Sequence, residues 1–150
     1  MESMKFIIHR VEDWNLLAQQ LVQRLPSNAV LTLSGPLGAG KTTLVQAIAR
    51  VLGASQNPRS PTFSLVRTYK LANTSPFSTL VHVDAYRLES PSDAITLGFD
   101  ELAAEDGSLL VIEWPERLGS ILNALHKPIV RLTITQDSGS EVRRVDFLMN

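Results

Sequence analysis

Residues 35–42 constrain this chain more than any other segment, because they read Gly-Pro-Leu-Gly-Ala-Gly-Lys-Thr. The segment matches the pattern G-x-x-x-x-G-K-[ST] at every specified position, and such a loop has to lie between a buried strand and a helix. Residues 29–34 form an apolar run between turn-forming residues, which predicts the strand. Residues 42–52 carry apolar side chains at helical spacing, and Gly53 is placed to end the helix.

The residue types of this loop suit the binding of phosphate groups. Glycines allow the backbone to turn with its N–H groups facing inward, and the start of the following helix adds free N–H groups and a positive dipole end. Lys41 supplies a charge for the β- and γ-phosphates, and the Thr42 hydroxyl is suited to Mg²⁺. We therefore predict nucleotide binding by Gly35, Pro36, Leu37, Gly38, Ala39, Gly40, Lys41, Thr42 and Thr43.

The rest of the chain predicts strands that alternate with helices. Strands are expected at residues 5–9, 29–34, 63–71, 80–84, 108–113, 129–135 and 141–148. Helices are expected from Val11 to the stop at Pro26, with Trp14 as a core anchor, at residues 42–52, from Ser90, and at residues 116–125. We expect one α/β domain over residues 1–150, P-loop NTPase-like, with a mostly parallel central sheet flanked by helices on both faces and a C-terminal antiparallel hairpin.

Two of the predicted strands end in an acid, Asp84 and Glu113. A phosphate loop needs an acid near the metal, usually at the end of a neighbouring strand. One acid would orient Mg²⁺ or its water shell and the other would position or deprotonate the attacking water, and the pattern leaves the assignment open. Thr62, in Ser-Pro-Thr-Phe, is a candidate for sensing the γ-phosphate or part of a plain turn, and Trp114 either borders the nucleotide or belongs to the core.

Charge and cysteine content limit the partners. The formal net charge is -1, so no overall basic field draws the chain to nucleic acid, and any contact with RNA has to be local or supplied by a partner. A local basic patch could form on the C-terminal hairpin from His126, Lys127, Arg131, Arg143 and Arg144, although a solvent-facing hairpin is the favoured explanation. The absence of cysteine excludes disulfides and thiolate metal sites. Without a signal-peptide pattern or an apolar stretch of about 20 residues, we expect a cytoplasmic protein that does not enter the membrane.

Five sequence blocks occur in a characteristic order: the glycine-rich loop, Ser-Pro-Thr-Phe, His-Val-Asp-Ala-Tyr-Arg-Leu from His82, Leu-Gly-Phe from Leu97 and Ile-Glu-Trp-Pro-Glu from Ile112. Together they resemble the bacterial TsaE (YjeE) ATPase family over almost the whole chain. The resemblance implies a Mg²⁺-dependent ATPase that supports threonylcarbamoyladenosine modification of tRNA. It also implies the partners TsaD and TsaB, a role in resetting that transferase pair, and slow hydrolysis without them.

Carried over by matching position, the resemblance implies phosphate contact for Lys41, Mg²⁺ binding for Thr42 and Glu113, γ-phosphate sensing for Thr62, hydrolysis for Asp84 and a place near the nucleotide for Trp114. The chain departs from the family at Pro36, where an acid is usual. Proline lacks an N–H and restricts its own φ, so the mouth of the loop should be stiffer. We expect the loop geometry to survive and the rate of hydrolysis to be the property affected.

Other functions remain compatible with a phosphate loop. A small-molecule kinase would need an acceptor pocket and an arginine-rich lid, and no arginine cluster follows the loop beyond the scattered Arg59, Arg67 and Arg87. An ATP-binding switch module without significant turnover would use the same residues as an ATPase. A GTPase is disfavoured because no Asn-Lys-x-Asp block occurs. No arginine finger is assigned, although Arg87 is the nearest candidate within the chain.

Overall fold

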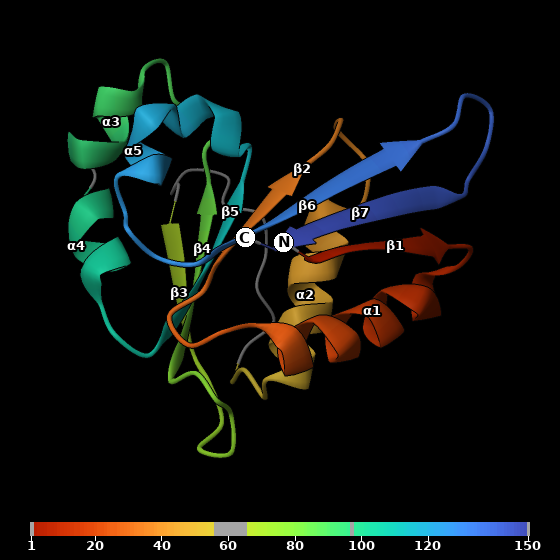
Figure 1. Cartoon of the computed structure of the whole chain (residues 1–150), viewed down its shortest axis with the longest axis horizontal. Coiled ribbons are helices and arrows are strands. Elements are labelled where there is room, and N and C mark those ends of the chain that lie inside the picture. The colour runs from red at the N-terminus through yellow and green to blue at the C-terminus, as the bar shows by residue number, and fades with distance from the viewer. Residues whose placement is uncertain (1, 56–65, 97, 150) are drawn as a thin grey trace.

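The computed structural model describes residues 2–55, 66–96 and 98–149. Its strands are β1 (Glu2–Ile8), β2 (Val30–Ser34), β3 (Val66–Lys70), β4 (Thr79–Asp84), β5 (Ser108–Glu113), β6 (Ile129–Gln136) and β7 (Arg143–Met149). Its helices are α1 (Val11–Arg24), α2 (Lys41–Val51), α3 (Pro91–Thr96), α4 (Phe99–Ala104) and α5 (Ser120–Asn123), with the 3₁₀ helix η1 (Pro115–Leu118). Figure 1 shows the strands joined in one twisted sheet, with both chain ends close together.

The sheet has the strand order β1-β7-β6-β2-β5-β4-β3. The four central strands, β6, β2, β5 and β4, run parallel to one another. Antiparallel strands extend both sides, with β3 beside β4 and with β7 and then β1 beside β6. The predicted mixed α/β architecture, its parallel centre and its C-terminal hairpin are therefore confirmed. The parallel centre brings the carboxyl ends of β2, β4 and β5 to one edge of the sheet.

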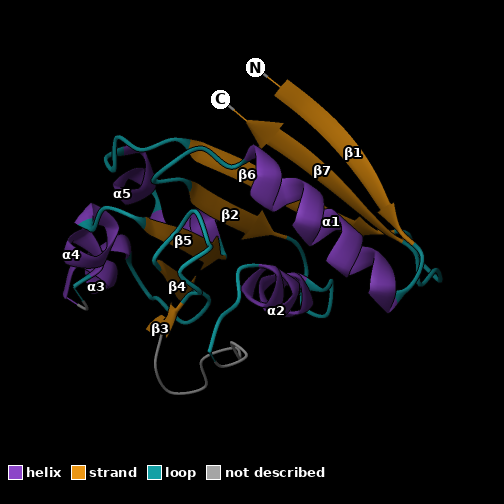
Figure 2. Cartoon of the chain, turned by 90° about the horizontal axis from the view of Figure 1, so that it is seen from below, coloured by secondary structure: helices purple, strands orange, loops and turns teal. Residues whose placement is uncertain are grey.

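Helices lie on both faces of the sheet (Figure 2). On one face α1 and α2 enclose a core that contains Leu17 and Ile48. On the other face a second core, containing Phe99 and Leu118, lies between the shorter helices and strands β2, β4 and β5. The surface of β7 on that second face is polar and exposed, as at Arg144. On the second face the helices therefore cover β2, β5 and β4, whereas Thr133 of β6 and Arg144 of β7 are exposed.

The structure differs from the predicted elements in two places. Residues 116–125 do not form one helix, because Gly119 adopts φ 55° and ψ -134° between η1 and α5. Helical residues need φ near about -63° and ψ near about -42°, so this conformation ends the first turn and starts another. Helix α4 was not predicted. The first part of the strand predicted at residues 63–71, and Thr62 before it, lie outside the described residues.

Helix α1 is placed by a cap at its start and by an apolar stripe. The Asp13 carboxylate accepts hydrogen bonds from the backbone N–H groups of His9 (2.8 Å) and Arg10 (3.2 Å), and these bonds lower the pKa of Asp13. The stripe buries Trp14, Leu17, Ala18 and Leu21, as the helical spacing predicts. Because α1 packs on α2, Trp14 reaches the segment that joins β2 to α2.

Candidate functional site

The glycine-rich loop, residues 35–42, runs from the end of β2 into the start of α2. Two of its glycines are required by close packing. A Cβ atom at Gly35 would lie 2.7 Å from the Ile134 carbonyl oxygen of β6. Gly40 has a left-handed φ of 111°, and a Cβ atom there would overlap the indole ring of Trp14. Strand β6 and helix α1 therefore hold the loop at both of its ends.

Lys41 folds back over this loop. Its Nζ donates hydrogen bonds to the carbonyl oxygens of Gly35 and Pro36, the second at 3.1 Å, and lies 4.1 Å from the centre of the Trp114 ring. The Pro36 carbonyl also accepts a hydrogen bond from the Ala39 N–H at 3.1 Å. Pro36 has no backbone N–H to donate, but its carbonyl oxygen accepts two of the hydrogen bonds that form the turn of the loop.

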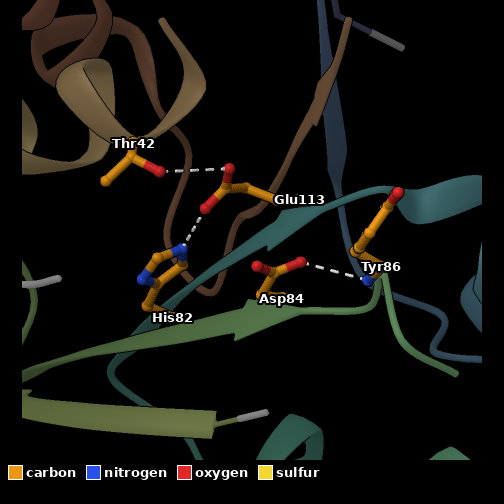
Figure 3. Close-up of polar contacts among 5 residues, drawn as sticks. All are labelled: Thr42, His82, Asp84, Tyr86 and Glu113. Atoms are coloured by element: carbon orange, nitrogen blue, oxygen red, sulfur yellow. Dashed lines mark hydrogen bonds and ion pairs between the residues drawn. The ribbon is translucent and has the colours of Figure 1, made fainter. Parts of the chain in front are cut away.

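Asp84 and Glu113 lie side by side, because the parallel register of β4 and β5 pairs these two residues. The Thr42 hydroxyl donates to Glu113 Oε1 at 3.5 Å, and His82 Nε2 lies 2.6 Å from Glu113 Oε2 (Figure 3). The Asp84 carboxylate accepts a hydrogen bond from the Tyr86 N–H at 3.0 Å. The two predicted acids thus lie next to each other beside the start of α2.

Burial changes the pKa of two groups in this arrangement. It lowers the pKa of the Lys41 ammonium below its usual value, while the negative charges of Glu113, Glu116 and Asp84 oppose the shift. Burial also raises the pKa of the Asp84 carboxyl above its usual value, and the hydrogen bond from Tyr86 opposes that shift. A lysine and an aspartate with such shifts in one place are typical of a functional site.

A cavity of about 260 Å³ joins these groups, and it is lined by Leu37, Gly38, Ala39, Gly40, Lys41, Thr42, Thr43, Asp84, Tyr86, Glu113 and Trp114. It therefore brings together the predicted site residues from the loop and from the two acidic strand ends. Gly35 and Pro36 do not line the cavity, but their carbonyl oxygens accept the hydrogen bonds of Lys41 Nζ. Tyr86 was not predicted, and its ring lies 4.9 Å from the ring of Trp114. Its only signal was the tyrosine in the block that begins at His82.

A second cavity, of about 320 Å³, lies on the other side of the loop. It shares Gly38, Ala39, Gly40 and Thr43 with the first, and is further lined by Ile8, His9, Arg10, Val11, Trp14, Glu141 and Arg143. Arg143 Nη2 donates to the Gly38 carbonyl at 3.5 Å. The interpretation of Trp14 as a core anchor alone was therefore incomplete, because this buried side chain also forms part of the cavity wall.

Arg143 and Arg144 point to opposite faces of β7, because side chains alternate along a strand. Arg143 faces the loop, whereas Arg144 pairs with Asp137 at 3.2 Å on the exposed surface. The structure therefore contradicts a basic patch that contains both arginines. Arg87, the predicted nearest source of an arginine finger, does not line either of these cavities.

The oxygen donors of the first cavity suit a small hard cation. Mg²⁺ usually keeps several waters and binds one or two protein oxygens together with phosphate oxygens. The Thr42 hydroxyl and the Glu113 carboxylate fit that requirement. Within residues 2–55, 66–96 and 98–149, no group of three or more His, Asp or Glu side chains is placed to hold a metal by itself.

Comparison with known proteins decides the family. A family model described as "Threonylcarbamoyl adenosine biosynthesis protein TsaE" matches residues 8–145. The chain belongs to the TsaE family. The resemblance seen in the sequence blocks is thereby confirmed, and the family acts in tRNA threonylcarbamoyladenosine biosynthesis.

Individual TsaE relatives match most of the chain. The tRNA threonylcarbamoyladenosine biosynthesis protein TsaE of Rickettsia felis is 41% identical over 154 residues, which covers 95% of this chain and 85% of that protein. The Synechocystis protein of the same name is 37% identical over 118 residues, covering 77% and 73%. The crystal structure of YdiB from Bacillus subtilis superposes with a TM-score of 0.70 at 27% identity, covering 97% of this chain and 84% of that one.

None of the helices in the part of this TsaE chain that the structure describes is long and apolar enough to cross a membrane.

Replacing Gly40 with alanine should destabilise the protein more than replacing Gly38. Both glycines have positive φ, but a Cβ atom at Gly38 meets no other atom within 4 Å, whereas one at Gly40 overlaps Trp14. The overlap should add about 1–3 kcal/mol to the loss of unfolding free energy, measured with urea. Adding Trp14→Phe should restore part of the stability of Gly40→Ala. Equal losses for the two glycine variants would contradict this packing argument.

Proposed function

We propose that this TsaE-family protein binds Mg-ATP through a P-loop, residues 35–42, and hydrolyses it to ADP and phosphate. The observation that carries the proposal is the meeting of four groups in one cavity. Lys41 and Thr42 at the start of α2 lie beside Asp84 and Glu113 at the ends of two parallel strands. P-loop enzymes use a lysine for the phosphates, a hydroxyl and an acid for Mg²⁺, and a further residue that positions the attacking water.

Each group has a role that its surroundings support. Phosphate oxygens would replace the loop carbonyls as acceptors for Lys41, whose ammonium is already partly withdrawn from water. Thr42 and Glu113 would hold Mg²⁺, which when bound neutralises charge on the phosphates. Asp84 would orient the attacking water and accept its proton. The raised pKa of Asp84 suits that role, because it makes the carboxylate a stronger proton acceptor.

The nucleoside would occupy the second cavity. Both cavities open onto Gly38, Ala39, Gly40 and Thr43, so a ligand with its phosphates in the first can extend past the loop into the second. Acidic strand ends line the first cavity, whereas Trp14, His9 and Arg143 line the second. Aromatic and polar walls of this kind are suited to a base and a ribose.

The catalytic cycle would serve a partner complex. Among the described residues no arginine lines the first cavity, and Arg143 lies on the other side of the loop. An activating charge supplied by a partner accelerates many P-loop enzymes. We propose that the TsaD–TsaB transferase supplies it, that ATP turnover resets this pair in the cytoplasm, and that contact with tRNA is indirect.

The test is ATP turnover by the purified protein, alone and with the TsaD–TsaB pair, with phosphate and ADP both measured. We expect slow release of phosphate that rises when the pair is added. ADP formed without an equal amount of phosphate would favour a kinase, and a phosphorylated acceptor should then be sought. Tight binding without turnover under either condition would favour a switch module. A rate indifferent to the pair would contradict the proposed partnership but leave the ATPase activity intact.

A further inference from the structure

His82 is a fully buried polar side chain behind the candidate site. It comes from β4, two residues before Asp84, and the alternation of the strand points both side chains to the face that carries α2. Glu113 of β5 points to the same face, and His82 Nε2 lies 2.6 Å from Glu113 Oε2 (Figure 3). His82 does not line the cavity, so it can affect a ligand there only through another residue.

The two oxygens of the Glu113 carboxylate have different neighbours. Oε2 lies 2.6 Å from His82 Nε2, and Oε1 lies 3.5 Å from the Thr42 hydroxyl. An ionised carboxylate only accepts hydrogen bonds, so the imidazole carries its proton on Nε2. The other ring nitrogen, Nδ1, is buried and has no hydrogen-bond partner among the described residues. Among the described residues, Glu113 is therefore the one hydrogen-bond partner of the His82 ring.

Burying a histidine with one unpaired ring nitrogen lowers the stability of the fold. An apolar side chain at this core position would avoid the cost of desolvating polar atoms. Its neighbours along β4 on the two faces, such as Leu80 and Val83, are apolar and buried. A glutamate, by contrast, has three rotatable side-chain bonds and needs a second contact to fix its carboxylate. The structure provides that contact with His82.

We propose that His82 is a positioning residue for the cation site. Its hydrogen bond to Oε2 holds the Glu113 carboxylate so that Oε1 faces the place beside Thr42 where the cation binds. The inference rests on the proposed function, since Thr42 and Glu113 are proposed there as the Mg²⁺ ligands. Outer residues that orient a ligand in this way typically change metal affinity or activity by about 10–100-fold when they are removed.

The experiment measures nucleotide binding and needs no turnover. The full chain is titrated with the non-hydrolysable analogue AMP-PNP by calorimetry, once in Mg²⁺ and once in EDTA. The ratio of the two Kd values defines the magnesium enhancement. We expect His82→Leu to lower this enhancement by about 10-fold while leaving the Kd in EDTA unchanged. His82→Gln should retain most of it, because the glutamine amide can donate from nearly the position of Nε2.

Two controls separate positioning from stability. Leu80→Val alters the same face of the same strand without touching Glu113, and it should keep the full enhancement. In a Glu113→Ala background, adding His82→Leu should cause no further loss, because the residue through which His82 acts is gone. If thermal unfolding shows that His82→Leu does not fold, His82→Asn replaces it. The asparagine amide has the same chemistry as glutamine but is too short to reach Oε2.

The outcomes distinguish this inference from the function on which it rests. Wild-type protein that binds AMP-PNP equally well with and without Mg²⁺ would contradict the proposed function. A wild-type enhancement that survives unchanged in His82→Leu, or in His82→Asn, would overturn the role of His82 alone. Equal losses in His82→Gln and His82→Leu would also overturn it, since the shape of the ring and not its hydrogen bond would then matter.

Discussion

Lys41→Ala is expected to weaken the binding of Mg-AMP-PNP by at least about 100-fold, because a hydrogen bond to a charged group contributes about 1.5–3 kcal/mol and Lys41 is placed to make more than one. In the structure Lys41 Nζ is held by the carbonyls of Gly35 and Pro36 and lies over Trp114. Exchange of neutral carbonyls for phosphate oxygens would strengthen these contacts. Calorimetric titration measures the effect directly.

The matched control is Lys5→Ala, which removes an exposed lysine from β1 and should leave affinity unchanged. It keeps the change in net charge the same, so any general attraction of the nucleotide by positive charge is accounted for. Tight binding that persists in Lys41→Ala would mean that the loop does not hold the phosphates. The assignment of residues 35–42 as a P-loop would then be wrong.

Asp84→Asn is expected to abolish most ATP turnover, with a loss of at least about 100-fold, while AMP-PNP binding changes little. The asparagine oxygen can still accept the hydrogen bond from the Tyr86 N–H, so the local backbone should keep its form. The amide cannot accept a proton from water. Single-turnover release of phosphate measures the chemical step, and calorimetry measures binding in the same preparation.

Asp93→Asn provides the control for this substitution. Asp93 also accepts backbone hydrogen bonds, from Glu89 and Ser90 at 3.2 Å each, but it lies at the start of α3 and does not line the cavity. Its replacement should change stability and not turnover. If Asp84→Asn hydrolyses ATP at the wild-type rate, Asp84 is not the proton acceptor, and the neighbouring Glu113 becomes the candidate for that role.

Local sequence patterns were sufficient for the elements that carry the site. The apolar run before the loop, the helical spacing after it and the acids at the ends of β4 and β5 are each encoded within a few neighbouring residues. Their boundaries were predicted to within a few residues for that reason. The prediction of one helix at residues 116–125 was wrong, because Gly119 adopts a non-helical conformation. The neighbouring residues give no indication of that conformation.

The sequence by itself determined that a glycine-rich loop and two strand-end acids are present, together with the family to which the chain belongs. Only the tertiary structure shows how the loop and the two acids are placed relative to one another. The order of the strands places β4 beside β5, and their register sets Asp84 against Glu113. The His82–Glu113 contact spans 31 residues, and the contact from Arg143 to Gly38 spans 105. Contacts over such separations depend on how the strands pair, which nearby residues do not encode.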